Sequence, residues 1–246
     1  MSEGNRRVAI VTGASRGLGE TLAGFLAGSG YDLVLNARDS RVLEETAARL
    51  RRFETRIHTV AGNIGDAGVR RAMVAAAGDL GGLNLLVNNA SDLGVSPLPP
   101  LVEYPVEELA ALYQTNVFAP LALIQEALAL LRAQGGLVVN VSSDAALGGY
   151  EGWGAYGSSK AALDLVSKTL ANELRPAGIG VVSVDPGDMR TQMHQQAYPG
   201  EDISDRPLPE VTMPFWAWLL GQPVLAVSGG RYAAQAVGWE AQNEAV

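Results

Sequence analysis

The chain has 246 residues, 18 basic and 26 acidic, which gives a formal net charge of −8 at pH 7, and it contains no cysteine. The lack of cysteine excludes disulfides, iron–sulfur clusters and thiolate nucleophiles. Its two histidines, His58 and His194, lie too far apart for an HExxH metal site, so no metal ligands are predicted, although carboxylates could still hold a hard cation. The acidic excess argues against nucleic-acid binding, which needs clustered basic side chains.

The hydrophobic fraction of 48% is typical of a globular protein. No uninterrupted apolar run reaches the ~18 residues of a membrane span, and the first residues lack the apolar region of a signal peptide. We therefore expect a cytoplasmic protein without a membrane partner.

Short apolar runs rich in β-branched residues alternate with helix-length segments. The predicted strands are Val8–Thr12, Asp32–Asn36, Arg56–Ala61, Leu83–Asn88, Leu137–Ser142, Gly180–Asp185 and Val224–Val227. The predicted helices are Leu18–Gly28, Ser40–Phe53, Asp66–Leu80, Val106–Gln134 (one helix, or two with a kink at Pro120), Gly154–Pro176 and Glu210–Leu220. Nearly continuous hydrophobicity predicts strands buried on both faces. The pattern predicts an α/β chain of one domain, 1–246: a doubly wound, seven-stranded parallel sheet of the Rossmann type with helices on both faces.

One segment, 188–214, departs from this alternation. It contains four prolines and little periodicity, and it is long for a plain connection. We predict that it is a lid over the substrate, the alternative being a surface insertion.

The first predicted strand runs directly into a glycine-rich turn, Thr12–Gly19, with the spacing G-x-x-x-G-x-G. Glycine lets the backbone approach a ligand closely, and the helix that follows offers free N–H groups to a pyrophosphate. At the end of the second strand, where an NAD-binding unit carries an acid, the chain has Arg38 and no carboxylate before Asp39. Arg38 and Arg16 could clamp a 2′-phosphate, which favours NADP(H); the alternative is that both arginines are simply solvated.

Tyr156 and Lys160 are four residues apart, so they share one face of a predicted helix. An ammonium beside a phenol lowers the phenol pKa from about 10, which suits a general acid or base near neutrality. Ser143 and the segment Asn88–Ala90 end two other strands, and Asn116 lies on a helix between them. Ligands of open α/β sheets bind at this carboxyl edge.

These motifs, with Pro186, Gly187 and Thr191 after the sixth strand, resemble the short-chain dehydrogenase/reductase family from Arg7 to about Tyr232. The resemblance implies that Tyr156 gives a proton to the carbonyl oxygen in reduction, while Lys160 lowers its pKa and binds the nicotinamide ribose. Ser143, rather than its neighbour Ser142, would hold the carbonyl, and Asn116 would anchor a water of the proton relay.

The resemblance also implies the residues that contact the cofactor, which are Gly13, Ser15, Arg16, Gly17, Leu18, Gly19, Arg38, Asn63, Ile64, Asn89, Ala90, Tyr156, Lys160, Pro186, Gly187, Met189 and Thr191. Two departures stand out. Asn63 stands where many members have Asp. Ser91 replaces the glycine that follows N-N-A, so a turn with positive φ would become costlier and a side chain would enter near the nicotinamide.

The substrate side is less specific. Apolar residues at the expected site predict an apolar ketone: Leu147, Tyr150, Trp153 and Met193, together with Leu93 and Met213. His58 is interpreted as structural, and His194 could touch the substrate.

The function that follows is reduction of a ketone by NADPH, or the reverse oxidation of an alcohol. Two alternatives stay open: a dehydratase- or epimerase-like activity on the same fold, and a non-catalytic NADP(H)-binding sensor or scaffold. The resemblance further implies a homodimer or homotetramer packed through the helices that carry Asn116 and Tyr156.

Overall fold

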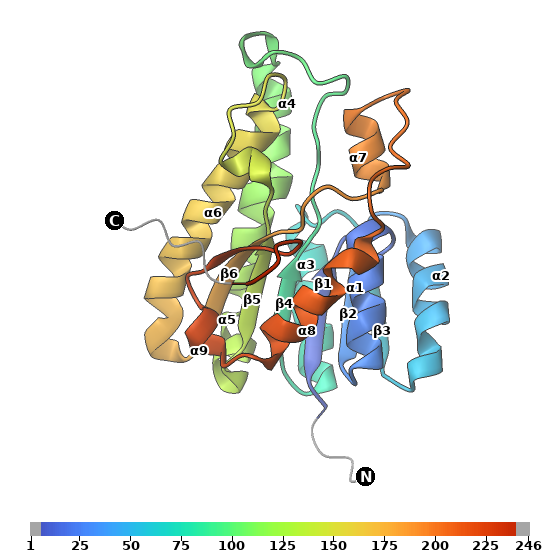
Figure 1. Cartoon of the computed structure of the whole chain (residues 1–246). Helices are drawn as coiled ribbons and strands as arrows, with labels where there is room; N and C mark the ends of the chain where they lie inside the picture. The colour runs from blue at the N-terminus through green and yellow to red at the C-terminus, as the bar shows by residue number, and fades with distance from the viewer. Residues whose placement is uncertain (1–5, 240–246) are drawn as a thin grey trace.

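The computed structural model describes residues 6–239 and shows a seven-stranded, all-parallel sheet in the order β3-β2-β1-β4-β5-β6-β7 (Figure 1). The strands are β1 (Val8–Thr12), β2 (Asp32–Ala37), β3 (Ile57–Ala61), β4 (Leu85–Asn88), β5 (Leu137–Val141), β6 (Gly180–Asp185) and β7 (Arg231–Ala233). The doubly wound fold predicted from the sequence is confirmed. Its strand order reverses between β1 and β4, the point at which ligands bind in such sheets.

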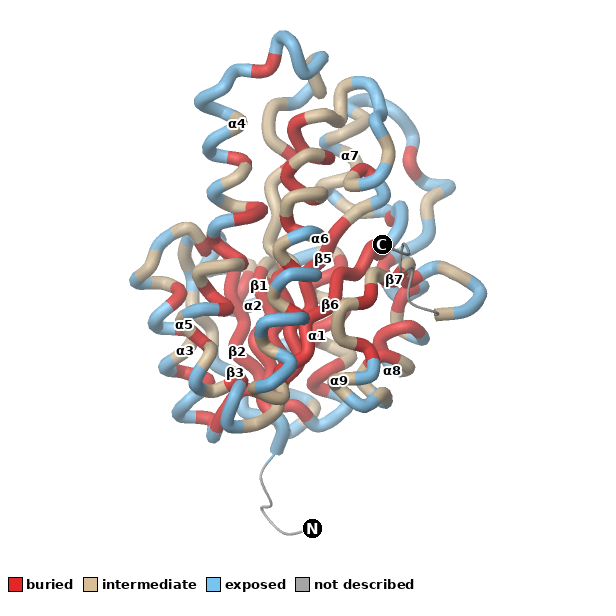
Figure 2. The backbone as a smooth tube through the Cα atoms, turned by 90° about the vertical axis from the view of Figure 1, so that its left-hand side faces the viewer, coloured by how far each residue is buried: buried red, intermediate tan, exposed pale blue. Residues whose placement is uncertain are grey.

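Helices cover both faces of the sheet. They are α1 (Gly17–Gly28), α2 (Ser40–Leu50), α3 (Ala67–Leu80), α4 (Val106–Tyr113), α5 (Ala119–Gln134), α6 (Gly154–Leu174), α7 (Gln192–Ala197), α8 (Met213–Gly221) and α9 (Val224–Val227). Successive residues of a strand point to opposite faces, so Val11 packs with α1 and α8 while Ile10 packs with α3 and α5. Figure 2 shows the resulting buried strands at the centre of the molecule.

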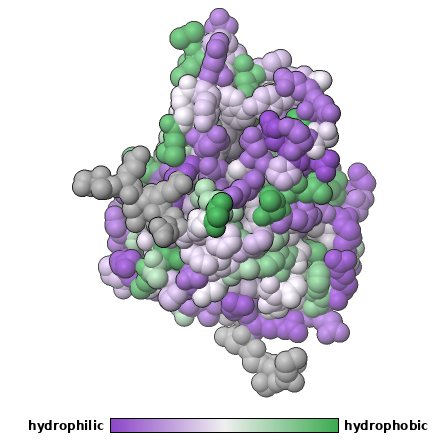
Figure 3. All heavy atoms as spheres, viewed as in Figure 1, coloured by the Kyte–Doolittle hydropathy of each residue, from purple (hydrophilic) through white to green (hydrophobic). Residues whose placement is uncertain are grey.

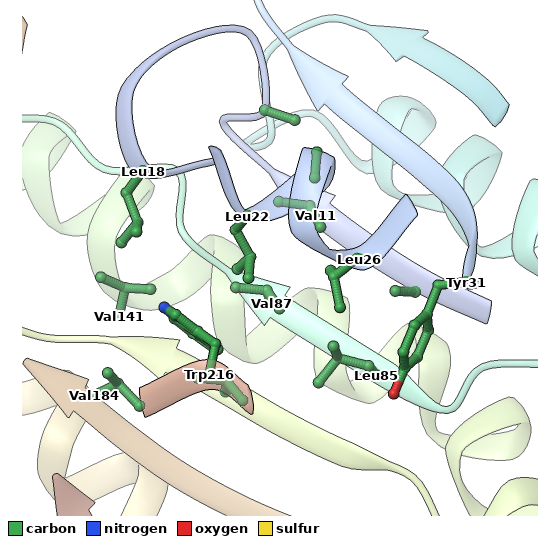
Figure 4. Close-up of a cluster of buried hydrophobic side chains, with 14 of the residues drawn as sticks. Val11, Leu18, Leu22, Leu26, Tyr31, Leu85, Val87, Val141, Val184 and Trp216 are labelled. Carbon is green, nitrogen blue, oxygen red and sulfur yellow. The ribbon is translucent and has the colours of Figure 1, made fainter. Parts of the chain in front are cut away.

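The core beneath α1 and α8 contains the largest fully buried side chain of the described residues, Trp216. Figure 4 shows Trp216 beside Val141 and Val184 of the sheet, with Leu18 and Leu22 of α1 nearby. This packing fixes α1, and therefore the glycine-rich turn at its start, against the carboxyl edge of the sheet.

Two strand predictions are wrong. The run Val224–Val227 is the short helix α9, and the seventh strand is Arg231–Ala233. A run of four apolar residues is ambiguous by itself, and Pro223 just before it suits a helix start. The second wrong prediction concerns β3, which was expected to be buried on both faces. It is exposed or half-buried along its length, because it lies at the edge of the sheet.

The predicted long helix, 106–134, is interrupted between α4 and α5 by a π-helical turn, Gln114–Phe118. Pro120, two residues after this turn, has no N–H to donate to the carbonyl of Asn116, so the regular α pattern cannot pass through this point. The turn holds Asn116 buried. By length and composition this stretch could also cross a membrane: its most apolar 18-residue window has a mean hydropathy of 1.3, and 44% of that window is buried inside the structure.

The segment 188–214 contains α7 and a 3₁₀ turn, Pro209–Thr212. The N–H of Arg190 donates to the carbonyl of Pro207 (2.7 Å), which ties the start of the segment to its end. In Figure 1 α7 stands beyond the carboxyl ends of the strands, on the side of α1 and α2. The segment therefore lies beside the edge at which the site was expected.

Candidate active site

A long groove crosses the carboxyl edge of the sheet and brings together most of the residues predicted to contact a cofactor. Fifteen of the seventeen line it: Gly13, Ser15, Arg16, Gly17, Leu18, Arg38, Asn63, Ile64, Asn89, Ala90, Tyr156, Lys160, Pro186, Met189 and Thr191. Gly187 lines the adjoining cavity instead, and Gly19 packs beneath the turn. The groove runs from the arginines at the end of β2 to Tyr156 and Lys160 on α6.

The glycine-rich turn is built so that only glycine fits. Gly13 and Gly17 have φ angles of 66° and 56°, which side chains disfavour. A Cβ on Gly19 would come within 2.3 Å of the carbonyl oxygen of Gly13. The Asn89 amide donates to the carbonyls of Thr12 (2.9 Å) and Gly13 (3.2 Å), which locks the turn to the end of β4. The groove floor is therefore bare backbone at the N-terminus of α1, which suits a diphosphate.

Both arginines proposed for the phosphate clamp line one end of the groove and already have partners. Arg16 donates to the side chain of Gln192 on α7. The guanidinium of Arg38 lies 3.8 Å from the carboxylate of Asp92, and 78% of its side chain is exposed. Asp39 accepts from the N–H of Val42 (3.1 Å) and so caps α2. Asp92 was not predicted; it is a carboxylate that approaches this end of the groove from the loop after β4.

Tyr156 and Lys160 lie at the other end, both buried on α6. The Lys160 ammonium donates to the carbonyl of Val141 (2.8 Å) and lies 5.5 Å from the centre of the Tyr156 ring. Burial lowers the pKa of Lys160 to about 8, against an opposing effect of Asp164. Burial also raises the pKa of the Tyr156 phenol above its ordinary 10.0, contrary to the lowering predicted from Lys160 alone. The cost of desolvating a phenolate at this buried position is the largest influence on the pKa of Tyr156.

Asn116 does not line the groove, but its side chain is fully hydrogen-bonded just behind it. Its amide donates to the carbonyl of Asp92 (2.9 Å) and to the Ser159 hydroxyl (3.0 Å). Its side-chain oxygen accepts from the N–H of Asp92 (2.8 Å) and from the Ser91 hydroxyl (3.1 Å). The π-helical turn thus fastens the loop after β4 to α6.

Ser143 and Ser142 follow β5, and both line the cavity next to Tyr156. The Ser143 hydroxyl donates to Asp144 (3.0 Å) and accepts from the N–H of Ala145 (3.2 Å). The buried Ser142 hydroxyl has no hydrogen-bond partner. Arg231 of β7 donates to the carbonyl of Ser143 (2.8 Å). The seventh strand, which the sequence had predicted at the wrong position, therefore helps to hold Ser143 in place.

The cavity in front of Tyr156 has a volume of about 380 Å³, within the usual range for a small-molecule site. Besides Tyr156, its apolar and aromatic lining consists of Leu93, Ala145, Tyr150, Trp153, Pro186, Met189, Met193 and Tyr198. Leu147 is not among the lining residues and is 65% exposed, while Met213 packs against the core.

Most of the polar residues that line this cavity were not predicted from the sequence. Asp144, Glu151, Asp185 and Asp188 bring four carboxylates to it. The positions of Asp185, the last residue of β6, and Asp144, three residues after β5, could have indicated this.

His194 lines the same cavity, half a turn into α7. Its side chain is 10% exposed, its Nδ1 lies 3.7 Å from Asp188, and its ring packs against Tyr198 at 5.0 Å between centroids. The other histidine, His58, is exposed on β3 and takes no part in the site.

The model of the short chain dehydrogenase family matches residues 7–202. The chain belongs to this family. One relative, a 3-oxoacyl-[acyl-carrier-protein] reductase of rhamnolipid biosynthesis from Pseudomonas aeruginosa, is 36% identical over 195 residues, which are 76% of this chain and 74% of the relative. An L-2,3-butanediol dehydrogenase from Corynebacterium glutamicum is 32% identical over 195 residues, 77% of this chain and 74% of the relative.

Solved structures of short chain dehydrogenases have the same fold. One from Pseudomonas syringae is 33% identical, with a TM-score of 0.87 and coverage of 93% of this chain and 94% of the other. One from Shigella flexneri 2a, in complex with NADP, is 28% identical, with a TM-score of 0.85 and coverage of 94% and 98%. This short chain dehydrogenase is accordingly an oxidoreductase of the family that interconverts carbonyl and alcohol groups.

Proposed function

We propose that this short chain dehydrogenase reduces a small ketone with NADPH, or oxidises the corresponding alcohol with NADP⁺. The observation that carries the proposal is the position of Tyr156, which lines both the cofactor groove and the substrate cavity. A ketone in the cavity would therefore lie next to the Tyr156 phenol, which would donate a proton, and next to the end of a dinucleotide bound in the groove.

The groove fits a nicotinamide dinucleotide because its floor is the glycine backbone that a Cβ would fill. Gly13, Ser15 and Gly17 would hold the diphosphate, Ile64 would contact the adenine, and Lys160 the nicotinamide ribose. When bound, NADPH supplies the hydride for the carbonyl carbon.

The protein residues supply orientation and the proton. Ser143 would donate a hydrogen bond to the carbonyl oxygen, and Tyr156 would transfer its phenolic proton to that oxygen as the alcohol forms. Burial keeps Tyr156 protonated at neutral pH, which suits a donor. The ammonium of Lys160 would offset the charge of the phenolate that remains.

The preference for NADP(H) rests on Arg16 and Arg38 at the far end of the groove. Complexes of related short chain dehydrogenases with NADP and NADPH agree with it. We expect Arg38→Ala to weaken NADPH binding about tenfold and to leave NADH binding unchanged, as measured by cofactor fluorescence. Equal affinities for the two cofactors in the unaltered enzyme, or no effect of Arg38→Ala on either, would contradict the clamp.

The test of the reaction is a panel of ketones assayed by NADPH oxidation, with Tyr156→Phe as the variant. Loss of turnover with unchanged NADPH binding is expected, because the phenol is the proton donor. Tyr113→Phe, a tyrosine on α4 outside the groove and cavity, is the matched control and should keep full activity. Full activity in Tyr156→Phe would remove the phenol from the mechanism.

Two other functions on this fold give different results in the same panel. A dehydratase or epimerase would convert its substrate with no net change in NADPH. A sensor or scaffold would bind NADPH tightly with no turnover of any ketone or alcohol. The buried pair Tyr156–Lys160 beside a substrate-sized cavity favours the reductase, since binding alone has no chemical need for it.

For the substrate, we propose a ketone with an apolar or aromatic body, since Trp153 and Tyr198 form a wall of the cavity with ring centres 6.2 Å apart. The four carboxylates at the cavity disfavour a substrate with a negative charge.

We also propose a cytoplasmic homodimer or homotetramer. Phe118 beside α5 and Leu165 on α6 are 51% and 67% exposed, and a second copy would cover them. On the face in Figure 3, which is that of Figure 1, hydrophobic residues lie in separate small groups among hydrophilic ones. Light scattering of the purified protein and of Leu165→Asp would measure the assembly, and a monomer at micromolar concentration would contradict it.

A further inference from the structure

Ser91, the serine that stands in place of the family glycine, lines the cofactor groove together with Tyr156 and is hydrogen-bonded to Asn116. The sequence suggested that a side chain at this position would make a turn with positive φ costlier. Ser91 causes no such strain, because it is not among the described residues with positive φ. Its hydroxyl donates to the side-chain oxygen of Asn116 (3.1 Å). Asn116 is in turn bonded to Ser159 (3.0 Å), which follows Tyr156 by three residues on α6, so this network reaches the helix of the phenol. Ser91 and Ser143 both act by hydrogen bonding to lower the pKa of the Tyr156 phenol.

The direction of the bond to Asn116 is fixed by its other partners. The Asn116 oxygen also accepts from the N–H of Asp92 (2.8 Å), and both amide hydrogens are used on the Asp92 carbonyl and on Ser159. The amide therefore cannot flip, and it presents an acceptor to Ser91. When Ser91 donates to Asn116, its own oxygen is free to accept from the Tyr156 phenol.

We infer that Ser91 is a further catalytic residue, whose hydroxyl turns from Asn116 to Tyr156 and donates a hydrogen bond to the phenolate as the phenolic proton leaves. This inference rests on the proposed function. In reduction the Tyr156 O–H bond breaks, a new O–H bond forms on the former carbonyl oxygen, and the carbonyl carbon receives the hydride. No proton leaves Ser91, and the Asn116 oxygen keeps the N–H of Asp92. The phenolate then takes a proton from water before the next turnover.

A glycine at this position could not do this, since it has no side-chain donor. The pKa of the buried phenol is raised by desolvation, and hydrogen bonding by Ser91 is the largest effect that opposes the rise, ahead of Ser143. A hydrogen bond to a charged group in a buried site corresponds to about one to two pKa units. The hydrogen bond from Ser91 would thereby offset part of the rise in the Tyr156 pKa that burial causes.

The test is the pH dependence of alcohol oxidation, in which the phenolate is the base and kcat/KM rises with pH to a plateau. In Ser91→Gly and Ser91→Ala we expect the pH of half-maximal kcat/KM to move up by about one unit, with a tenfold loss below it and a plateau nearly unchanged. Ser91→Thr keeps the hydroxyl and should restore the profile. Ser158→Ala, whose hydroxyl is bonded within α6 to the carbonyl of Ala155, is the matched control and should not shift it.

A second measurement needs no turnover. The ultraviolet absorbance of tyrosinate in the NADP⁺ complex, taken as the difference from Tyr156→Phe, titrates the phenol itself. Ser91→Ala should raise that midpoint by about one unit. An unchanged midpoint and an unchanged profile, in an enzyme that does oxidise alcohols, would overturn the role of Ser91 and leave the proposed function standing. Failure of the unaltered enzyme to turn over any substrate, with the midpoint still shifted by Ser91→Ala, would instead count against the proposed function.

Discussion

Gly19→Ala is predicted to disable the cofactor groove while the same substitution five residues further along α1 does not. A Cβ at Gly19 would lie 2.3 Å from the carbonyl oxygen of Gly13 and 2.5 Å from the amide of Asn89. Both positions gain up to about 1 kcal/mol of helix stability from alanine. At Gly19 this gain is offset by an overpacking cost of about 1–3 kcal/mol. The two bonds of Asn89 to Thr12 and Gly13, worth about 1 kcal/mol each, are lost as well.

Gly24→Ala is the matched control, because its Cβ would meet only the end of Leu50 at 3.6 Å, an ordinary contact. Thermal unfolding should place Gly19→Ala below Gly24→Ala by about 3–5 kcal/mol, which corresponds to about 6–20 °C in Tm for a chain of this size. NADPH should raise the Tm of Gly24→Ala as in the unaltered protein and fail to raise that of Gly19→Ala. Equal melting temperatures and equal NADPH shifts for the two variants would refute the reasoning.

Three further predictions concern charge. Burial lowers the pKa of Lys160 to about 8, while the unfolded chain keeps 10.5, so between these pH values the unfolded state holds more protons and the stability of the cofactor-free protein should rise with pH. Urea unfolding from pH 7 to 10 should show this rise in the unaltered protein and lose it in Lys160→Met; parallel curves would contradict it. Asp92→Asn should bind NADPH several-fold more tightly in fluorescence titrations, with NADH unaffected, because Arg38 loses a competing carboxylate 3.8 Å away. A keto acid should show a kcat/KM about 30-fold below that of its methyl ester. The reason is that two carboxylates of the cavity, Asp144 and Glu151, would each repel the acid by about 1 kcal/mol at about 8 Å. Equal kcat/KM values for the acid and the ester would show that charge does not select the substrate.

Local patterns were sufficient for much of the fold because strand and helix periods are properties of short segments. Five of the predicted strands became buried strands of the sheet, and the glycine-rich turn, Ser143 and the pair Tyr156–Lys160 came to one edge, as parallel strands require. Patterns failed at Val224–Val227, where four residues carry too little periodicity to separate a helical turn from a strand. They failed again at β7, which has three residues and is held by its register with β6.

The sequence by itself determined the fold class, the family and the order of the chemical groups along the chain, since these depend on residue type and spacing. The tertiary structure alone decided the electrostatics of the site. Burial depends on what packs around a side chain, so the raised pKa of Tyr156 could not be inferred from a lysine four residues away. Contacts between distant segments decided the rest: the approach of Asp92 to Arg38, the support of Ser143 by Arg231, and the bond from Ser91 to Asn116, two residues 25 positions apart.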